Sequence, residues 1–195
     1  INQAALILST ESQANMLTLR GFGKYRNYPT MQEYYKLKSL CLANYPMYRG
    51  VCSLLGMDIN PITPDIPSQF DALEKKFGNY DFIFLHVKTT DVTGEDGDFK
   101  AKVEAIEKLD SYITRLEALN PDVLIITGDH STPSALRSHS WHPVPVLLHS
   151  QYARLDGAKR FTEIECLKGA LGQLPAHDLM ALSLAHALRL KKFGA

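Results

Sequence analysis

Three segments of this 195-residue chain are almost continuous apolar runs, and they constrain the fold more than any other feature. They lie at residues 82–85, 123–126 and 146–148. A strand with one face in water alternates apolar and polar residues, whereas a strand of a parallel sheet is covered on both faces. We therefore predict buried strands over residues 81–87, 122–127 and 144–149, and a further strand over residues 38–43.

Helical patterns separate the predicted strands. We predict helices over residues 48–56, 68–77, 98–119 and 176–192. Asp98 suits the N-cap of the third helix because its side chain can accept a hydrogen bond from the first turn, and Pro121 stops that helix. This alternation predicts an α/β fold, specifically a three-layer α/β/α sandwich with a mostly parallel central sheet. Ligands of such sheets bind at the carboxyl ends of the strands.

The charge balance argues against two classes of partner. The chain carries 21 Lys and Arg residues against 21 Asp and Glu residues, which gives a formal net charge of zero. Phosphate backbones and anionic membranes attract basic patches, so we expect neither nucleic acid nor a membrane as partner. No apolar stretch approaches the roughly 20 residues that cross a bilayer. The three cysteines are widely spaced and lack a Cys-x-x-Cys motif, which is typical of reduced cysteines in a cytoplasmic protein.

Acidic and histidine side chains follow the predicted strands, at the points where those strands end. Asp91 and Glu95 follow the strand predicted over residues 81–87, and Asp129 and His130 follow the one predicted over residues 122–127. His139 lies on the connection that leads to the strand predicted over residues 144–149. If the strands are parallel, all five side chains project from one edge of the sheet. Carboxylate oxygens and imidazole nitrogens are ligands of divalent metals, so the sequence predicts a metal site at this edge.

Each of these features also has an ordinary structural explanation. Acidic residues beside glycine, such as Asp91 and Glu95, often serve only turns and helix caps. A single loop histidine such as His139 is more often simply solvated. The presence of all five residues on strand-end connections favours the metal site over these separate explanations.

The segments that carry these residues resemble cofactor-independent phosphoglycerate mutase, and most closely its archaeal-type branch within the alkaline phosphatase superfamily. The resemblance covers essentially the whole chain. It is carried by His86-Val87-Lys88 with Asp91 and Gly94-Glu95-Asp96-Gly97-Asp98, by Thr127-Gly128-Asp129-His130-Ser131-Thr132-Pro133, by His139-Ser140 with Pro143-Val144-Pro145, and by Tyr45-Pro46-Met47-Tyr48-Arg49-Gly50. The Asp-His pair with a downstream His is specific for the superfamily, and the longer acidic motif for this branch.

The resemblance implies two divalent metal ions, usually manganese, with zinc, cobalt or magnesium as alternatives. Asp91, Glu95 and His139 match the ligands of one ion, and Asp129 and His130 match half the ligands of the other. The implied reaction is the interconversion of 2-phosphoglycerate and 3-phosphoglycerate in glycolysis and gluconeogenesis, through a phosphoserine intermediate. By the same resemblance, Lys88 is a candidate for neutralising substrate phosphate, with a plain loop lysine as the alternative.

Members of this family are about twice as long as this chain. Their first half supplies an Asp ligand and the nucleophilic Ser, and we find no catalytic serine candidate among the 195 residues. We therefore expect a carboxyl-terminal portion whose sheet is incomplete, with the amino-terminal half of the same protein as its partner. Residues 1–30 are expected to be the tail of an inserted substrate-binding domain or a linker, and residues 31–195 the carboxyl-terminal part of the metal-binding domain. Asn15 and Arg20 are candidate substrate contacts, although Arg20 is equally well explained as a solvated loop arginine.

Two other functions remain open at this point. The chain could belong to a metal-dependent phosphatase or another phosphomutase of the same superfamily, because these enzymes share the ligands named above. It could also be a non-catalytic metal-binding remnant. In every case we expect the chain alone to be inactive, and an exposed apolar sheet edge would favour oligomers.

Overall fold

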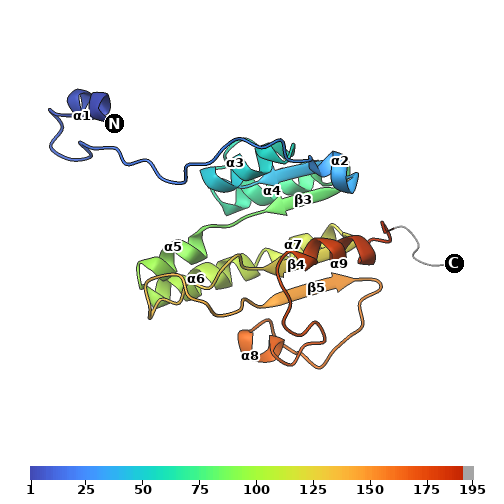
Figure 1. Ribbon diagram of the computed structural model, residues 1–195. Coiled ribbons are helices and arrows are strands. Elements are labelled where there is room, and N and C mark those ends of the chain that lie inside the picture. The colour runs from blue at the N-terminus through green and yellow to red at the C-terminus, as the bar shows by residue number, and fades with distance from the viewer. Residues whose placement is uncertain (191–195) are drawn as a thin grey trace.

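The computed structural model describes residues 1–190, and Figure 1 shows the arrangement of its helices and strands. The strands are β1 (Ser39–Leu42), β2 (Asp58–Ile59), β3 (Phe82–Leu85), β4 (Val123–Thr127) and β5 (Val146–Ser150). The helices are α1 (Asn2–Ile7), α2 (Met31–Tyr35), α3 (Pro46–Leu54), α4 (Ile66–Lys76), the 3₁₀ turn η1 (Phe77–Asn79), α5 (Thr89–Glu95), α6 (Phe99–Asp110), α7 (Ile113–Ala118), α8 (Glu163–Cys166) and α9 (Asp178–His186).

The strands form two sheets. In the first, β1 lies between β2 and β3 and is parallel to both. In the second, β4 pairs with β5 in antiparallel register, with Thr127 opposite Val146. The predicted α/β class with a parallel sheet is confirmed. The strand predicted over residues 144–149, which is β5, runs antiparallel to β4.

The chain between β4 and β5 explains this direction. A parallel neighbour needs a crossover of a dozen or more residues, which is usually a helix. Here the connection contains no helix and folds back on itself through an antiparallel bridge between Ser131 and Ser140. It therefore returns the chain to the edge of the sheet at which β4 ended.

Helices cover both faces of the first sheet. Cys41 of β1 and Ala43, which follows the strand, lie on one face and pack in a cluster with Cys52 of α3 and Leu184 of α9. The alternate residues of β1 point to the other face, where they pack against Phe70 of α4. This alternation follows from the two-residue period of a strand, and it produces the predicted three layers.

The predicted helices are present with shifted ends. Helices α3 and α4 begin two residues before the predicted starts, because a proline occupies the first turn of each and Asp65 caps α4. The helix predicted over residues 98–119 is divided into α6 and α7 at Ser111, whose hydroxyl donates to the Lys108 carbonyl at 2.6 Å. The helix predicted over residues 176–192 ends at His186, and its last two predicted residues lie outside the described part of the chain.

Residues 1–30 lie apart from the layered body. After α1 the chain has no regular element until α2, whose N-cap residue Thr30 forms a reciprocal capping box with Glu33. Figure 1 shows this segment projecting away from the sheets. Phe22 and Tyr25 in it are more than 80% exposed.

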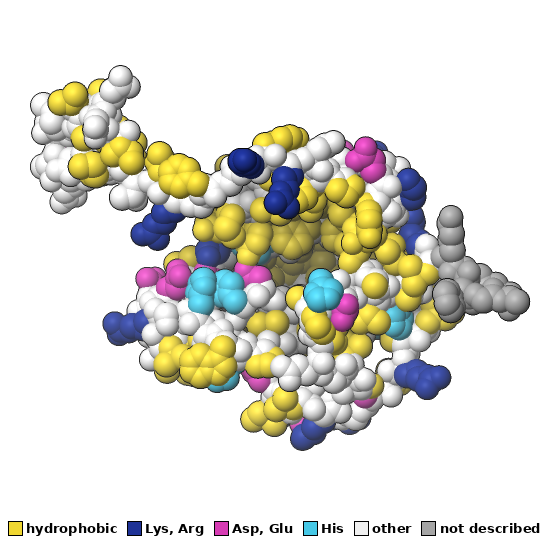
Figure 2. Space-filling model, viewed as in Figure 1, with side chains coloured by type: hydrophobic (Ala, Val, Ile, Leu, Met, Phe, Trp, Pro, Cys, Tyr) yellow, Lys and Arg dark blue, Asp and Glu magenta, His cyan; other side chains and the backbone are white. Residues whose placement is uncertain are grey.

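An apolar hollow lies between the sheet of β1, β2 and β3 and the part of the molecule that contains β4 and β5. Strands β3 and β4 belong to separate sheets, and every residue of β3 is only half-buried although all four are apolar. Figure 2 shows hydrophobic side chains lining this hollow, with histidine and acidic side chains along its lower border. In physical terms the sheet is incomplete, because buried strands of this composition normally have both faces and both edges covered.

Phe70→Ala should destabilise the chain strongly. Phe70 is fully buried against Leu40 and Leu42, so its removal leaves a cavity in the tightest part of the core. We expect a loss of about 3–5 kcal/mol in the free energy of unfolding, measured by urea denaturation. Phe22→Ala is the matched control, because Phe22 is 84% exposed and its removal should change stability by less than about 0.5 kcal/mol. Equal effects of the two changes would contradict the assigned core.

Candidate metal centre

Helix α5 carries two of the predicted ligands. Strand β3 ends at Leu85, and α5 begins at Thr89 after a short connection. Asp91 and Glu95 are four residues apart, so both carboxylates lie on one side of the helix. The Asp91 side chain is 12% exposed and that of Glu95 is 50% exposed, so the site opens toward solvent at Glu95.

The connection between β4 and β5 carries the other three. Asp129 and His130 come directly after β4. The bridge between Ser131 and Ser140 folds the connection back, and it places the His139 ring on the His130 ring with centroids 3.7 Å apart. One short hairpin therefore brings both imidazoles to the end of α5.

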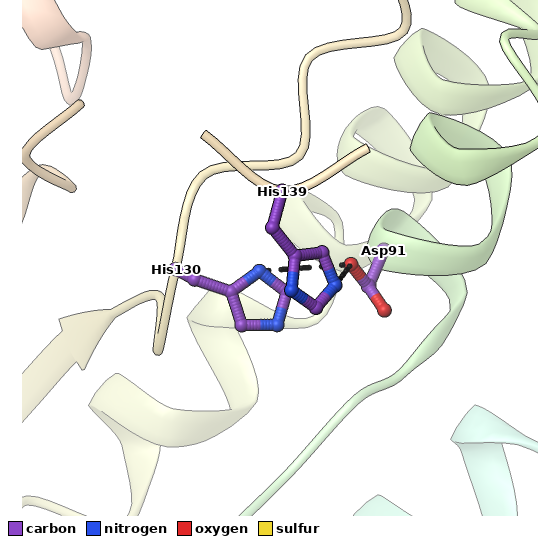
Figure 3. Close-up of side chains that lie close together, drawn as sticks. All are labelled: Asp91, His130 and His139. Atoms are coloured by element: carbon purple, nitrogen blue, oxygen red, sulfur yellow. Dashed lines mark ion pairs between the residues drawn. The ribbon is translucent and has the colours of Figure 1, made fainter. Parts of the chain in front are cut away.

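The five predicted ligands form one cluster. His139 Nε2 lies 3.3 Å from Glu95 Oε1 and 3.7 Å from Asp91 Oδ1. His130 Nδ1 lies 3.7 Å from the same Asp91 oxygen, and His130 Nε2 lies 3.3 Å from Asp129 Oδ2. Figure 3 shows His130 and His139 both directed at the Asp91 carboxylate.

These separations fit divalent metal binding. Two ligand atoms that each lie about 2.1 Å from a tetrahedral ion are roughly 3.4 Å apart. The measured separations of 3.3–3.7 Å bracket that value. Candidate ligand atoms of Asp91, His130 and His139 all lie within 4.8 Å of one another. A mixed set of carboxylates and imidazoles suits manganese, zinc and related ions.

Neighbouring groups keep the two aspartates ionised. Burial alone would raise the pKa of the Asp91 carboxyl, but hydrogen bonds from Lys88 and Thr132 and the Lys88 charge bring that pKa below its usual value. Burial also opposes ionisation of Asp129, but the hydrogen bond from the Tyr48 hydroxyl, the nearby His130 and hydrogen bonds from backbone N–H groups together outweigh it, so the pKa of Asp129 is lowered too. Both carboxylates are therefore in the form that binds cations.

Three residues support the site without having been singled out from the sequence pattern. Tyr48 of α3 donates to Asp129, and its ring lies 4.4 Å from that of His86. The Thr132 hydroxyl contacts both Asp91 and His130. Gly94 leaves room for the Thr132 carbonyl, because a Cβ atom at position 94 would overlap it. All three belong to segments that carry the family resemblance, but a hydroxyl or a glycine alone indicates no ligand contact.

The candidate substrate-binding residues are divided in space. Lys88 lies in the cluster, where it forms an ion pair with Asp91 and lies 4.7 Å above the centre of the Tyr45 ring. Asn15 and Arg20 are exposed in the segment that precedes α2. Among the described residues, neither has a hydrogen bond or ion pair with the cluster, so their substrate role stays a prediction.

Comparison with known proteins identifies the family. The sequence matches the Metalloenzyme superfamily over residues 7–186. The chain belongs to this superfamily. Membership implies divalent metal binding. The alkaline phosphatase-like fold predicted from the motifs is confirmed.

Curated relatives share the name of the predicted family. A probable 2,3-bisphosphoglycerate-independent phosphoglycerate mutase of Aquifex aeolicus is 50% identical over 196 residues, which covers 100% of this chain and 48% of that relative. A protein of the same description from Thermus thermophilus is 48% identical over 192 residues, with 97% and 47% coverage. The resemblance stated from the motifs is confirmed. The chain spans about half the length of these relatives.

Two solved structures share the fold. A protein from Pyrococcus horikoshii matches with a TM-score of 0.84 and 34% identity over 90% of this chain and 57% of that chain. The cofactor-independent phosphoglycerate mutase of Thermoplasma acidophilum matches with a TM-score of 0.67 over 82% of this chain and 39% of that chain. At 21% identity, the second likeness supports the fold alone. Among residues 1–190, no helix is both long and apolar enough to cross a membrane.

Proposed function

We propose that this chain is the metal-binding portion of a phosphoglycerate mutase that interconverts 2-phosphoglycerate and 3-phosphoglycerate in cytoplasmic glycolysis and gluconeogenesis. One observation carries the proposal. Five potential metal ligands converge at one edge of the sheets, in a chain 46–50% identical to curated probable mutases. Phosphomonoester chemistry needs cations beside the transferred group, and this cluster would hold them.

Two divalent ions, with manganese as the preferred metal, are proposed for the complete protein. Asp91, Glu95 and His139 would hold one ion, because His139 Nε2 lies 3.3 Å from Glu95 and 3.7 Å from Asp91. Asp129 and His130 would hold the other with ligands from the rest of the protein, since His130 Nε2 lies 3.3 Å from Asp129. When bound, the ions would neutralise phosphoryl oxygens and lower the pKa of a hydroxyl nucleophile.

The residues of this chain would prepare the site before substrate arrives. Lys88 holds Asp91 ionised, and its ammonium group remains near enough to the cluster to pair with substrate phosphate. The hydrogen bond from Tyr48 orients the Asp129 carboxylate. These contacts fix the ligands in position, which is the main contribution a protein makes to a metal site.

The rest of the protein would complete both sheet and site. The apolar hollow beside β3 and β4 is suited to further strands, which we assign to the amino-terminal half. That half would also supply the nucleophilic serine. Residues 1–30 would then be the tail of an inserted substrate-binding domain or a linker, with Asn15 and Arg20 contacting substrate.

A metal-dependent phosphatase is the second candidate, because an enzyme of that class would use the same metal ligands. Glu95 and His139 have side chains that are 50% and 54% exposed in this chain, which spans about half the length of its curated relatives, so the remaining half would decide whether water reaches the cluster. A mutase must keep water away from the transferred phosphoryl group. Release of inorganic phosphate without formation of the isomeric phosphoglycerate would identify the phosphatase.

The chain alone should convert no 3-phosphoglycerate in the presence of manganese, because it contributes metal ligands but no assigned phosphoryl acceptor. When the chain is co-expressed with the amino-terminal half of the Aquifex aeolicus relative, the pair should convert 3-phosphoglycerate to 2-phosphoglycerate. ³¹P NMR measures this conversion. His139→Ala in the same pair should remove this activity, whereas His149→Ala on β5 should not. Turnover by the chain alone, or turnover unchanged by His139→Ala, would contradict the proposal.

A further inference from the structure

Lys102 of helix α6 places a charged group at the contact between α5 and the connection after β4. Its Nζ atom donates a hydrogen bond to the backbone carbonyl of Thr132 at 2.5 Å. The side chain is half-buried, and among residues 1–190 it forms no ion pair. Lysines rarely leave water without an acidic partner, because the ammonium group loses hydration free energy. The position of Lys102 therefore indicates a role that offsets this loss.

The ammonium group of Lys102 lies against α5 at Gly94. A Cβ atom at position 94 would lie 2.9 Å from Lys102 Nζ, and it would overlap the Thr132 carbonyl. Gly94 is buried, and it lies between Asp91 and Glu95 on the same helix. Lys102 therefore meets the Thr132 carbonyl beside the helical turn that carries both carboxylates of α5.

The two segments that meet at Lys102 carry like charges. Asp91 and Glu95 lie on α5, and Asp129 lies on the connection after β4. Without a bound cation these carboxylates repel one another, which favours separation of α5 from the connection. Lys102 opposes this separation, because it holds the connection to α6 and α6 packs on α5. Its positive charge also reduces the repulsion.

A second hydrogen bond joins the connection to α5, but it uses a candidate ligand. The Thr132 hydroxyl donates to Asp91 Oδ1 at 2.5 Å, and His130 Nδ1 lies 3.7 Å from that oxygen. A metal ion bound at Asp91 would compete with the hydroxyl for the same atom. The bond from Lys102 uses a backbone carbonyl, so it can hold the connection whether or not an ion is bound.

We propose that Lys102 is a positioning residue that holds the connection after β4 against α5, so that the candidate ligands of these two segments lie at metal-binding distance before an ion arrives. The consequence for metal binding rests on the proposed function. The contact itself does not, because it is a property of the chain without metal. Partners of this kind, which touch no metal but fix its ligands, are typical of metal sites in proteins.

The first test measures the contact between the two segments in the metal-free chain. The Thr132 methyl group lies close to Gly94, since a Cβ atom at position 94 would be 3.0 Å from Thr132 Cγ2. The NMR nuclear Overhauser effect between the Gly94 Hα protons and this methyl group should be lost in Lys102→Met, which keeps the apolar stem without the ammonium group. Lys100→Met is the matched control, because Lys100 lies on the same helix with 89% of its side chain exposed. An unchanged effect in Lys102→Met, or an equal loss in Lys100→Met, would overturn the proposal.

The second test measures manganese affinity by calorimetric titration. Lys102→Met should weaken manganese binding by about 10–100-fold, as the loss of other partners that orient metal ligands does. Lys100→Met should bind manganese as the wild type does. Equal affinity in Lys102→Met and the wild type would overturn the positioning role.

A chemical rescue separates the ammonium group from a general effect on folding. Lys102→Cys is made together with Cys166→Ala, because the other two native cysteines are buried. Alkylation with 2-bromoethylamine restores a side chain with the length and charge of lysine, whereas iodoethane adds a neutral chain. The first product should regain manganese affinity and the contact between Gly94 and Thr132, and the second should regain neither. Equal behaviour of the two products would overturn the proposal. If the wild type binds no manganese, the proposed function fails, and the contact measured by NMR still decides the role of Lys102.

Discussion

Asp91→Ala should abolish the strong manganese-binding event of the chain. Asp91 is the most buried of the five candidate ligands, and its Oδ1 atom lies 3.7 Å from a nitrogen of each of the two imidazoles. Losing an outer hydrogen-bond partner already weakens metal affinity by about 10–100-fold, so losing the ligand itself should weaken it by more than about 100-fold. Calorimetric titration with manganese measures this effect, and His139→Ala should behave in the same way.

Two further variants make this result specific. Asp129→Ala should weaken the event less, because two assigned ligands, Asp129 and His130, form that position among residues 1–190, and two ligands rarely hold a divalent ion tightly. His149→Ala removes an exposed histidine of β5 and should leave binding unchanged. Loss of the strong event only with Asp129→Ala would reverse the assignment of the two positions.

Gly94→Ala should disrupt the site although the change adds only one methyl group. A Cβ atom at position 94 would overlap the carbonyl oxygen of Thr132 and lie 2.9 Å from Lys102 Nζ. Backbone cannot yield as a side chain can, so α5 and the loop after β4 must move apart. We expect a loss of about 1–3 kcal/mol in the free energy of unfolding, together with loss of strong manganese binding.

Gly50→Ala is the matched control for this change. Gly50 lies in helix α3, and a Cβ atom there would meet nothing within 4 Å. Alanine should therefore stabilise the chain by about 0.5–1 kcal/mol. Chemical denaturation and manganese titration of both variants give the comparison. Equal stability and equal binding in Gly94→Ala and the wild type would contradict the close packing of α5 on Thr132.

The sequence predicted the layered core well because the strands are strongly apolar. The alternating contacts of β1 follow from burial on both faces, whereas the continuous apolar run of β3 predicts such burial and β3 is only half-buried in this chain. The direction of β5 was not predictable, because strand composition is the same for either direction. It depends on the turn that closes at Ser131 and Ser140, a contact between residues nine apart. Strand β2 has two residues, too few for a pattern.

The site was predictable as a set of residues but not as a geometry. The spacing of Asp91 and Glu95 indicated a shared side only if the segment were helical, and α5 meets that condition. The contacts of Thr132 and Tyr48 could not be predicted, because the sequence does not distinguish a buried hydroxyl from an exposed one. Among the described residues, Asn15 and Arg20 have no hydrogen bond or ion pair with the cluster. Local sequence carries no information about the distant residues that would contact them.

The location of bound manganese tests the central claim most directly. Crystals of the chain grown with manganese chloride, measured at the manganese absorption edge, would place each ion by its anomalous signal. We predict the strongest peak between Asp91, Glu95 and His139, with any second and weaker peak between Asp129 and His130. No peak at the cluster, or a stronger peak elsewhere on the chain, would contradict the assignment of these residues as a metal centre.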